Sequence, residues 1–200
     1  MLLKVKFLGH EIENNTIKPI PSKIEAIKRI QSPKDKKDVM QFLGSVNFYS
    51  KFVEKLQMNL KPLYTLLQDD VKFQWTPELE KTFQDVKQAM TAETELTIPN
   101  TKHPFFITVD ASLVGLGAVL FQMNEDNKMR DISYNSRILN TQEQKLSTLD
   151  RELLYALQIY EFIIIGSPHP KYIFTDHKPL LHCFTKKETL AQGSIEHKCN

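Results

Sequence analysis

The spacing of apolar residues changes partway along the chain, from a helical period to an alternating one. Between residues 22 and 90 apolar side chains recur every three or four positions, which is typical of amphipathic helices. The main stripes are Ile24, Ile27 and Ile30; Val39, Leu43, Val46 and Val53; and Leu79, Phe83, Val86 and Met90. Ser32-Pro33 and Thr76-Pro77 are typical helix starts, because a hydroxyl can cap a helix and proline fits its first turn.

Alternating patterns on both sides of this helical stretch predict strands. Residues 3–20 alternate loosely around Asn14-Asn15, which predicts a small hairpin. After a break at Ile98-Pro99 we predict strands at 103–110, 116–123, 132–134 and 172–176, a helix at about 143–164, and a short helix at 177–184. Residues 103–110 carry apolar side chains on both faces, which favours a central strand. The predicted domain boundary is near residue 98.

Composition narrows the classes of protein to consider. The chain has 200 residues, 41% of them hydrophobic and 25% charged, which is typical of a globular protein and not of a disordered or collagen-like one. No apolar run is long enough for a membrane span. Lysines interrupt the apolar start, so we expect an intracellular protein, cytoplasmic or nuclear, and not a secreted one. Its two cysteines, Cys183 and Cys199, fit a reducing compartment and no metal pattern.

Positive charge is concentrated in one segment, although the net charge is only +2. Residues 18–37 contain seven basic side chains and two acidic ones. The basic residues, called here the basic stripe, are Lys18, Lys23, Lys28, Arg29, Lys34, Lys36 and Lys37. Such a stripe can neutralise nucleic-acid phosphates, or it can be an ordinary solvated helix face. Charge alone favours the solvated helix face, since runs of charge are usually solvated.

Three acidic residues occupy positions that suit a metal site. Asp110 and Asp176 each end a predicted strand, and Glu152 lies beside the apolar stripe of the long predicted helix. Converging carboxylates repel one another, and a hard cation such as Mg²⁺ removes that cost. Two such ions can activate water and stabilise the leaving oxygen of a phosphodiester. Taken singly, each acid is more typical of a cap, a turn or a solvated position than of a metal site, and Asp176 can simply cap the helix that follows it.

Two further polar residues adjoin the acidic ones. Ser112 follows Asp110 closely, and His177 follows Asp176 directly. His177 can be a metal ligand, a proton carrier or a helix cap. We expect Ser112 and His177 to lie next to the acidic residues and support them without taking part in the reaction themselves.

Several short motifs occur together in a characteristic order. They are Phe7-Leu8-Gly9-His10, Gln41-Phe42-Leu43-Gly44, Asn47-Phe48-Tyr49, Phe73-Gln74-Trp75, Thr108-Val109-Asp110-Ala111-Ser112, Gly115-Leu116-Gly117-Ala118-Val119-Leu120, Tyr134-Asn135-Ser136-Arg137, Glu152-Leu153-Leu154 and Thr175-Asp176-His177. With this set, residues 5–185 resemble the polyprotein of gypsy-class LTR retrotransposons, from the end of reverse transcriptase into ribonuclease H. Any one motif is weak, whereas the ordered set is specific.

The resemblance implies an α+β fold, with a helical thumb-like subdomain followed by a truncated, mixed-sheet ribonuclease H-like domain. Residues 1–20 are expected to be the last hairpin of the polymerase palm, and residues 21–98 the thumb and connection. Residues 99–187 are expected to be the ribonuclease H-like domain without its C-terminal part, and residues 188–200 an atypical tail. No fifth strand is expected after Phe184, and the family's fourth acidic position has no match.

The function implied by the resemblance is metal-dependent endonucleolytic hydrolysis of the RNA strand in an RNA–DNA hybrid. Asp110, Glu152 and Asp176 are then the catalytic and metal-binding residues, with Mg²⁺ or Mn²⁺ as cofactor. The expected partners are a hybrid or template–primer duplex, gripped by the basic stripe, and the rest of the polyprotein, with no membrane. The polymerase aspartates are absent from this chain. The alternatives are a non-catalytic nucleic-acid-binding remnant and a domesticated transposon-derived protein.

Overall fold

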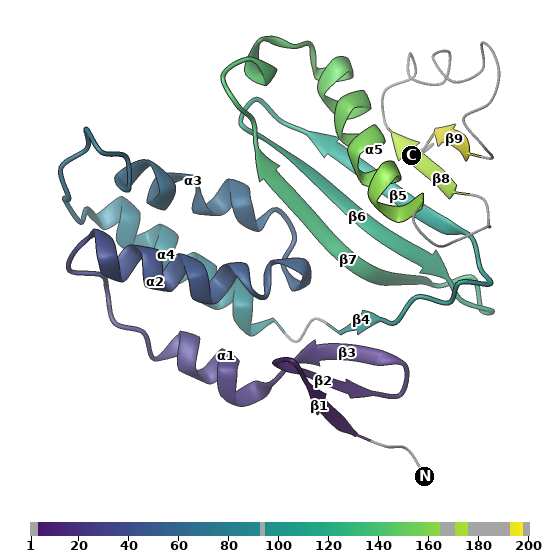
Figure 1. Cartoon of the computed structure of the whole chain (residues 1–200), viewed down its shortest axis with the longest axis horizontal. Helices are drawn as coiled ribbons and strands as arrows, with labels where there is room; N and C mark the ends of the chain where they lie inside the picture. Colours follow the sequence, from purple (N-terminus) through teal and green to yellow (C-terminus); the bar gives the residue numbers. More distant parts are fainter. Residues whose placement is uncertain (1–3, 93–94, 165–170, 176–192, 198–200) are drawn as a thin grey trace. The chain divides into compact units, whose positions relative to one another are not determined.

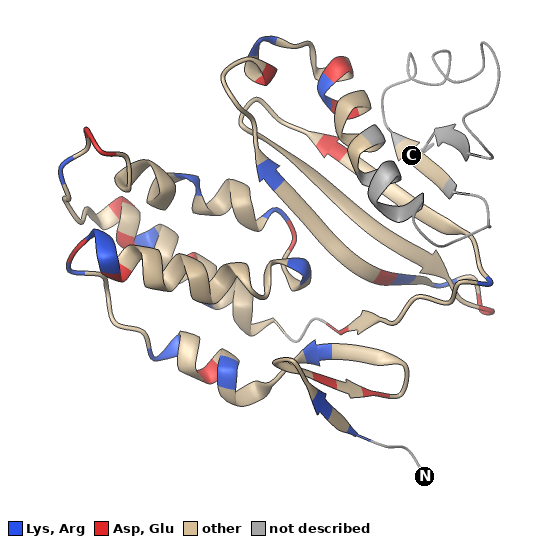
Figure 2. Ribbon diagram, in the orientation of Figure 1, with Lys and Arg blue, Asp and Glu red and all other residues tan. Residues whose placement is uncertain are grey.

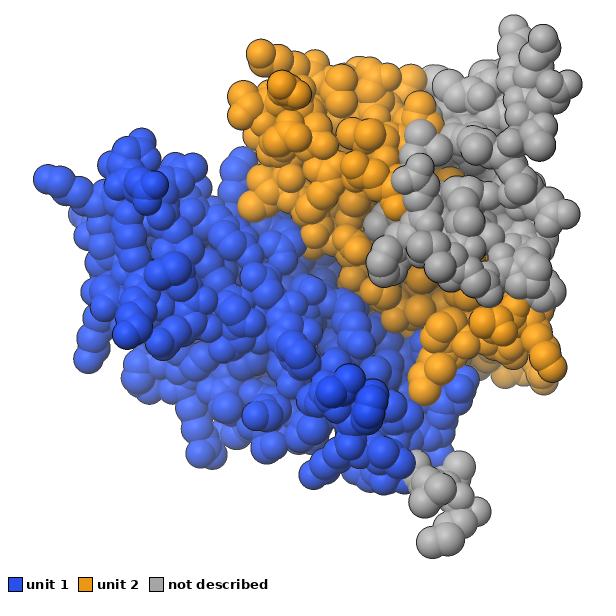
Figure 3. All heavy atoms as spheres, viewed as in Figure 1, with its two compact units in different colours: residues 1–97 blue, residues 98–200 orange. Residues whose placement is uncertain are grey.

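The computed structural model describes residues 4–92, 95–164, 171–175 and 193–197 (Figure 1). The chain divides into two units, Met1–Thr97 and Ile98–Asn200 (Figure 3). Among the helices in the described ranges, none combines the length and apolar character needed to cross a membrane.

Short antiparallel strands begin the first unit. They are β1 (Val5–Phe7), β2 (His10–Glu13) and β3 (Thr16–Pro19), and β4 (Leu96–Thr97) adds to β3 at the end of the unit. Asn14 and Asn15 connect β2 to β3 with φ of 51° and 61°, a tight turn that asparagine tolerates. This confirms the predicted hairpin. A second tight turn at Leu8 and Gly9, with φ of 44° and 77°, adds the strand β1.

Helices make up most of the first unit. They are α1 (Pro21–Lys28), α2 (Lys36–Asn47), the 3₁₀ helix η1 (Ser50–Phe52), α3 (Leu56–Leu66) and α4 (Pro77–Thr91). The predicted start of α4 is confirmed, since the Thr76 hydroxyl accepts a hydrogen bond from the Leu79 N–H at 3.3 Å. The predicted cap at Ser32 is wrong. Asp35 caps α2 by accepting from the Asp38 N–H at 2.8 Å, because its carboxylate suits the positive end of the helix.

The apolar stripes of these helices form the core of the first unit. Phe42 of α2 packs against Phe83 of α4, with ring centroids 4.5 Å apart. Val39 of α2 and Leu56, Leu60 and Leu63 of α3 are fully buried as well. Burial of these side chains is the main driving force for this unit.

A mixed five-stranded sheet forms the second unit, in the order β7-β6-β5-β8-β9. The strands are β5 (Phe105–Ala111), β6 (Gly115–Met123), β7 (Met129–Ile138), β8 (Lys171–Thr175) and β9 (Gly193–His197). β5, β6 and β7 pair antiparallel, whereas β8 runs parallel to both β5 and β9. The prediction that residues 103–110 contribute a central strand is confirmed.

The expectation that no strand follows Phe184 is wrong. β9 pairs with β8 over five residues, with Tyr172 opposite Ser194 and Ile173 opposite Ile195. Its sequence, Gly-Ser-Ile-Glu-His, contains a single large apolar residue, so it shows no alternation that would reveal a strand. The sheet therefore has one strand more at this edge than the sequence predicts.

One helix covers a face of this sheet (Figure 1). It is α5 (Thr148–Ile164), which is preceded by the 3₁₀ helix η2 (Glu143–Lys145). The core beneath α5 consists of Ile107, Val109, Leu116, Ala118, Leu139, Tyr155, Ala156 and Ile173. The helix begins later than predicted because the Ser147 hydroxyl caps it, accepting from the Asp150 N–H at 3.1 Å.

Candidate active site and nucleic-acid interface

Asp110 lies near the end of the central strand β5, where its side chain is exposed. Val109 points into the core under α5, and the alternation of the strand turns Asp110 away from that core. In the parallel register of β5 with β8, Thr108 pairs with Phe174, and each of these residues stands two positions before an aspartate, Asp110 or Asp176. Asp176 and His177 lie outside the described residues.

Glu152 is on α5 and is only 2% exposed. The sequence places it beside the apolar stripe, but in the structure it belongs to the buried face itself, with Tyr155 and Ala156 next along the helix. Apolar spacing does not reveal this, because an acidic residue counts as polar in the pattern. Packing restricts the orientation of the Glu152 side chain, in contrast to that of the exposed Asp110.

A hydrogen bond links the segments that carry these two acidic residues. Arg151, next to Glu152, donates from Nη1 to the carbonyl of Ser112, two residues after Asp110, at 3.1 Å. The Ser112 hydroxyl closes the turn between β5 and β6, accepting from the Gly115 N–H at 3.0 Å. The structure thus brings the start of α5 and the end of β5 together, and Ser112 acts within the turn that joins β5 to β6.

Carboxylate oxygens are the ligands that Mg²⁺ prefers, so Asp110 and Glu152 fit a magnesium site by their chemistry. Within the described ranges no three His, Cys, Asp or Glu residues gather closely enough to hold a metal ion. Asp176, the third acidic residue of the predicted set, falls outside those ranges. The described residues therefore supply two candidate ligands from neighbouring segments.

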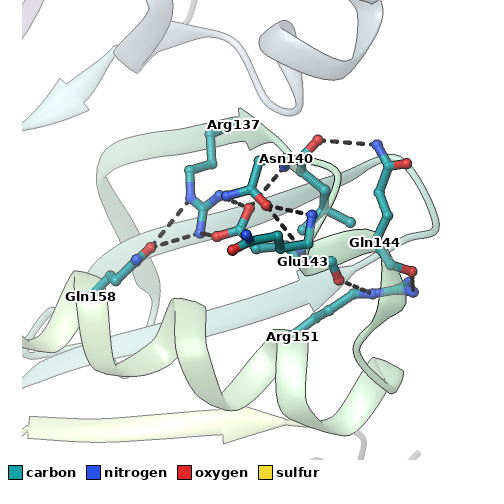
Figure 4. A network of polar contacts seen from close by, with 8 residues as sticks. Arg137, Asn140, Glu143, Gln144, Arg151 and Gln158 are labelled. Atoms are coloured by element: carbon teal, nitrogen blue, oxygen red, sulfur yellow. Dashed lines mark hydrogen bonds and ion pairs between the residues drawn. The ribbon is translucent and has the colours of Figure 1, made fainter.

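A polar network surrounds η2 beside this site (Figure 4). The Arg137 guanidinium on β7 donates to both carboxylate oxygens of Glu143, at 2.7 and 2.8 Å, and to Gln158 on α5 at 2.9 Å. Glu143 also accepts from the Asn140 N–H at 2.9 Å. Hydrogen bonds from Arg137 are the main reason that the pKa of Glu143 is lowered from its usual value. The motif Tyr134-Asn135-Ser136-Arg137 contains the central residue of this network, but it does not reveal the partners, because Glu143 and Gln158 come 6 and 21 residues later.

Four members of the basic stripe already have partners in the first unit. Lys18 lies 3.2 Å from a Glu95 oxygen. Glu25 on α1 pairs with Arg29 at 3.2 Å and with Lys28 at 4.0 Å, so both signs of charge occur on this helix (Figure 2). The ammonium of Lys36 donates to the carbonyl of Gln68 at 2.5 Å.

The other three members of the stripe are exposed. Within the described part of the chain, the ammonium groups of Lys23, Lys34 and Lys37 take part in no ion pair or hydrogen bond. They are therefore better placed than Lys28 or Arg29 to meet an added phosphate without giving up an existing partner.

The outer face of α2 is a second candidate surface, which the sequence analysis missed. Met40 and Phe48 are each 54% exposed there, on the same face as the exposed Lys37 and Gly44. A side chain at Gly44 would meet nothing within 4 Å, so packing within the unit does not require a glycine. Instead the glycine leaves bare backbone between two large apolar side chains. The sequence does contain a signal for this surface, namely Gly44 inside a helical pattern. A glycine there lowers the stability of the helix unless another role compensates.

Comparison with known proteins agrees with the motifs. Residues 75–165 match the family described as the RNase H-like domain found in reverse transcriptase. The Tf2-3 and Tf2-4 transposon polyproteins of Schizosaccharomyces pombe are each 30% identical to this chain over 187 residues. The match covers 92% of this chain and 14% of each polyprotein.

Solved structures with the same fold come from foamy virus. The protease–reverse transcriptase in complex with double-stranded DNA aligns with a TM-score of 0.79 at 18% identity, covering 98% of this chain and 45% of that one. The same enzyme in complex with an RNA/DNA hybrid gives a TM-score of 0.77 at 19% identity, covering 98% of this chain and 29% of that one. At this identity the likeness shows the fold.

Fold and relatives together define the class of protein. The chain corresponds to the region of a retrotransposon polyprotein that contains the RNase H-like domain, as its motifs predict. A gypsy-class element is consistent with these relatives. Members of the RNase H-like family generally depend on divalent metal ions.

Proposed function

We propose that the second unit cuts the RNA strand of an RNA–DNA hybrid and that the first unit binds nucleic acid. Asp110, Glu152 and Asp176 are the proposed catalytic residues and ligands for Mg²⁺ or Mn²⁺. The observation that carries this proposal is the contact between the two elements that bear Asp110 and Glu152, through Arg151 and Ser112.

The topology of the sheet supports the choice of these three residues. β5 and β8 are adjacent and parallel, so their carboxyl ends lie at the same edge, where open α/β sheets bind ligands. Asp110 is near the end of β5, and β8 ends one residue before Asp176. Glu152 comes from α5, which packs on β5.

Glu152, Asp110 and Ser112 would have different roles in the proposed reaction. Glu152, held by packing, would fix one side of the metal site, and the exposed Asp110 would face the substrate side. When bound, the metal would activate water and stabilise the charge that develops on the phosphate. Ser112 would keep the turn after Asp110 closed through its bonds to Gly115.

The first unit would bind phosphates and the surface of the duplex. Lys23, Lys34 and Lys37 supply positive charge that no internal partner occupies within the described ranges. The face of α2 with Met40, Gly44 and Phe48 offers apolar contact and an open stretch of backbone, which suits close approach to sugars and base edges in a groove. The hybrid named for the foamy virus complex is a substrate of the kind proposed.

The direct test is cleavage of an end-labelled RNA–DNA hybrid in Mg²⁺ and in Mn²⁺. We expect Asp110→Asn to reduce the rate more than about 100-fold, because even residues that only support metal ligands are worth about 10- to 100-fold. Asp126→Asn is the matched control, since Asp126 is exposed in the turn after β6. It should cut at the wild-type rate.

Two outcomes would contradict this proposal. Equal cutting by wild type and Asp110→Asn would show that the activity comes from elsewhere. Binding of the hybrid without cutting in either metal would instead favour a non-catalytic binding module.

A further inference from the structure

Arg151 is a cation buried in the second unit, and among the residues that the structure describes its guanidinium bonds only to main-chain oxygens. It is 5% exposed. Nε donates to the carbonyl of Glu143 at 3.2 Å, Nη2 to that of Gln144 at 2.8 Å and Nη1 to that of Ser112 at 3.1 Å. In the described part of the chain no carboxylate pairs with it. Burying a charge without a counter-ion is costly, so these three hydrogen bonds must offset a large desolvation penalty.

The position of Arg151 within α5 does not by itself favour an arginine. It lies in the first turn of the helix, where the positive end of the helix dipole disfavours a cation. The start of the helix is already capped by Ser147, which bonds to Asp150 through its hydroxyl and accepts from the Asp150 N–H. What the guanidinium adds is therefore its contacts to other segments.

Those contacts join two separate segments of the chain. One is η2, through the carbonyls of Glu143 and Gln144, and the other is the turn after β5, through the carbonyl of Ser112. A planar guanidinium with five N–H groups can reach both segments at once. A lysine ammonium is a single point and cannot span them.

The η2 segment is itself held from its other side. Arg137 grips the Glu143 carboxylate with two hydrogen bonds and also donates to Gln158 on α5 (Figure 4). Arg151 therefore ties the turn after Asp110 to a part of the unit that is already fixed to both β7 and α5.

We propose that Arg151 is a positioning residue that holds the turn after Asp110 against the helix carrying Glu152. This inference rests on the proposed nuclease function, because it assigns Arg151 the task of fixing the separation between the two carboxylates. Arg151 does not contact substrate or metal in this role. It acts through the main chain of Ser112 on one side and through its neighbour Glu152 on the other.

The test compares Arg151→Lys and Arg151→Gln with Tyr155→Phe. Tyr155 is the matched control, because it lies one turn further along α5 and its hydroxyl bonds to Asn135 on β7 at 2.7 Å, away from Ser112. Three quantities are measured for each variant. The first is hydrogen exchange of the Val114 and Gly115 amides, which donate to the Ser112 hydroxyl at 3.3 and 3.0 Å. The others are the Mn²⁺ affinity, by calorimetry, and the Mg²⁺ concentration that gives half-maximal hybrid cleavage.

We expect both Arg151 variants to exchange the Val114 and Gly115 amides at least about ten-fold faster and to need about ten-fold or more metal, the range typical of residues that orient metal ligands. Excess Mg²⁺ should restore much of the Arg151→Lys rate. Tyr155→Phe should lose thermal stability without either change. If Arg151→Lys matches Tyr155→Phe in exchange and in Mn²⁺ affinity, the positioning role is overturned.

The wild-type protein separates this inference from the proposed function. A wild type that neither binds Mn²⁺ nor cuts the hybrid would overturn the nuclease assignment, and with it a role for Arg151 in an active site. If the wild type cuts and binds metal, the comparison of Arg151→Lys with Tyr155→Phe decides the role of Arg151 alone. Arg151→Lys keeps the charge, so it remains informative should Arg151→Gln fail to fold.

Discussion

Helix α1 of the first unit and helix α5 of the second use charged residues in different ways. In the first unit, charges such as those of Glu25, Lys28 and Arg29 pair with one another near the surface of a helix. In the second unit, Arg151 and Glu152 are buried in the first turns of α5. Surface ion pairs contribute little to stability, so the first unit depends mainly on its apolar core. Buried charges fix the backbone around them, which is what a site needing defined geometry requires.

The largest effect is expected from the core of the first unit. Phe42→Ala should lower the free energy of unfolding by about 3–5 kcal/mol, because Phe42 is 1% exposed and its ring packs against that of Phe83. Met40→Ala, at a 54% exposed position on the outer face of the same helix, should change it by less than about 0.5 kcal/mol. Urea unfolding followed by fluorescence reports on this unit, since Trp75 is the only tryptophan in the chain. Similar losses for the two variants would show that burial of Phe42 is not what stabilises this unit.

Much of the fold could be predicted because apolar spacing and helix caps are local signals. The Thr76-Pro77 start and the stripe with Phe83, Val86 and Met90 are where the pattern places them. The predictions are wrong where two possible helix caps compete or where a strand has little apolar pattern. Ser32 and Asp35 both precede α2 as possible caps, and the pattern cannot decide between them. β9 is an edge strand with little apolar content, and its pairing with β8 comes from distant parts of the chain.

The candidate site could be predicted only in part. Motif order selects Asp110, Glu152 and Asp176, but whether they converge depends on tertiary contacts that no local pattern contains. Arg151 is the clearest case: its acceptors are main-chain carbonyls, one of them 39 residues away, and any residue type can supply a carbonyl. The exposed face of α2 did leave a signal, because Gly44 interrupts a helix without a packing reason.

A smaller effect is expected from acid on the second unit. Hydrogen bonds from Arg137 lower the pKa of Glu143 below its ordinary value of 4.5, so the folded state favours the carboxylate. The resulting stability is fully present above that ordinary value and is lost as the pH falls through the lower folded value. Unfolding in urea, followed by NMR signals of β7, should therefore show stability that decreases as the pH is lowered through and below 4.5.

Glu143→Gln provides the control for this acid effect. Because glutamine does not titrate, the variant should begin less stable near neutral pH and lose less as the pH falls. If the free energy of unfolding falls equally steeply with decreasing pH in the wild type and in Glu143→Gln, other carboxylates cause the acid sensitivity of this unit.

The smallest effect is expected at the surface of the first unit, where single lysines meet a bound duplex. Lys37→Ala should reduce the salt dependence of hybrid binding by about 0.9 log units per log unit of salt, the contribution of one phosphate contact. Lys28→Ala should reduce it less, because Lys28 already lies 4.0 Å from Glu25 and shares that carboxylate with Arg29. Binding is measured by fluorescence anisotropy over a range of salt concentrations, using Asp110→Asn as background so that the hybrid stays intact. If Lys37→Ala and Lys28→Ala reduce the salt dependence equally, pairing with Glu25 does not prevent a charge from reaching phosphate. The contrast between paired and unpaired members of the basic stripe would then be wrong.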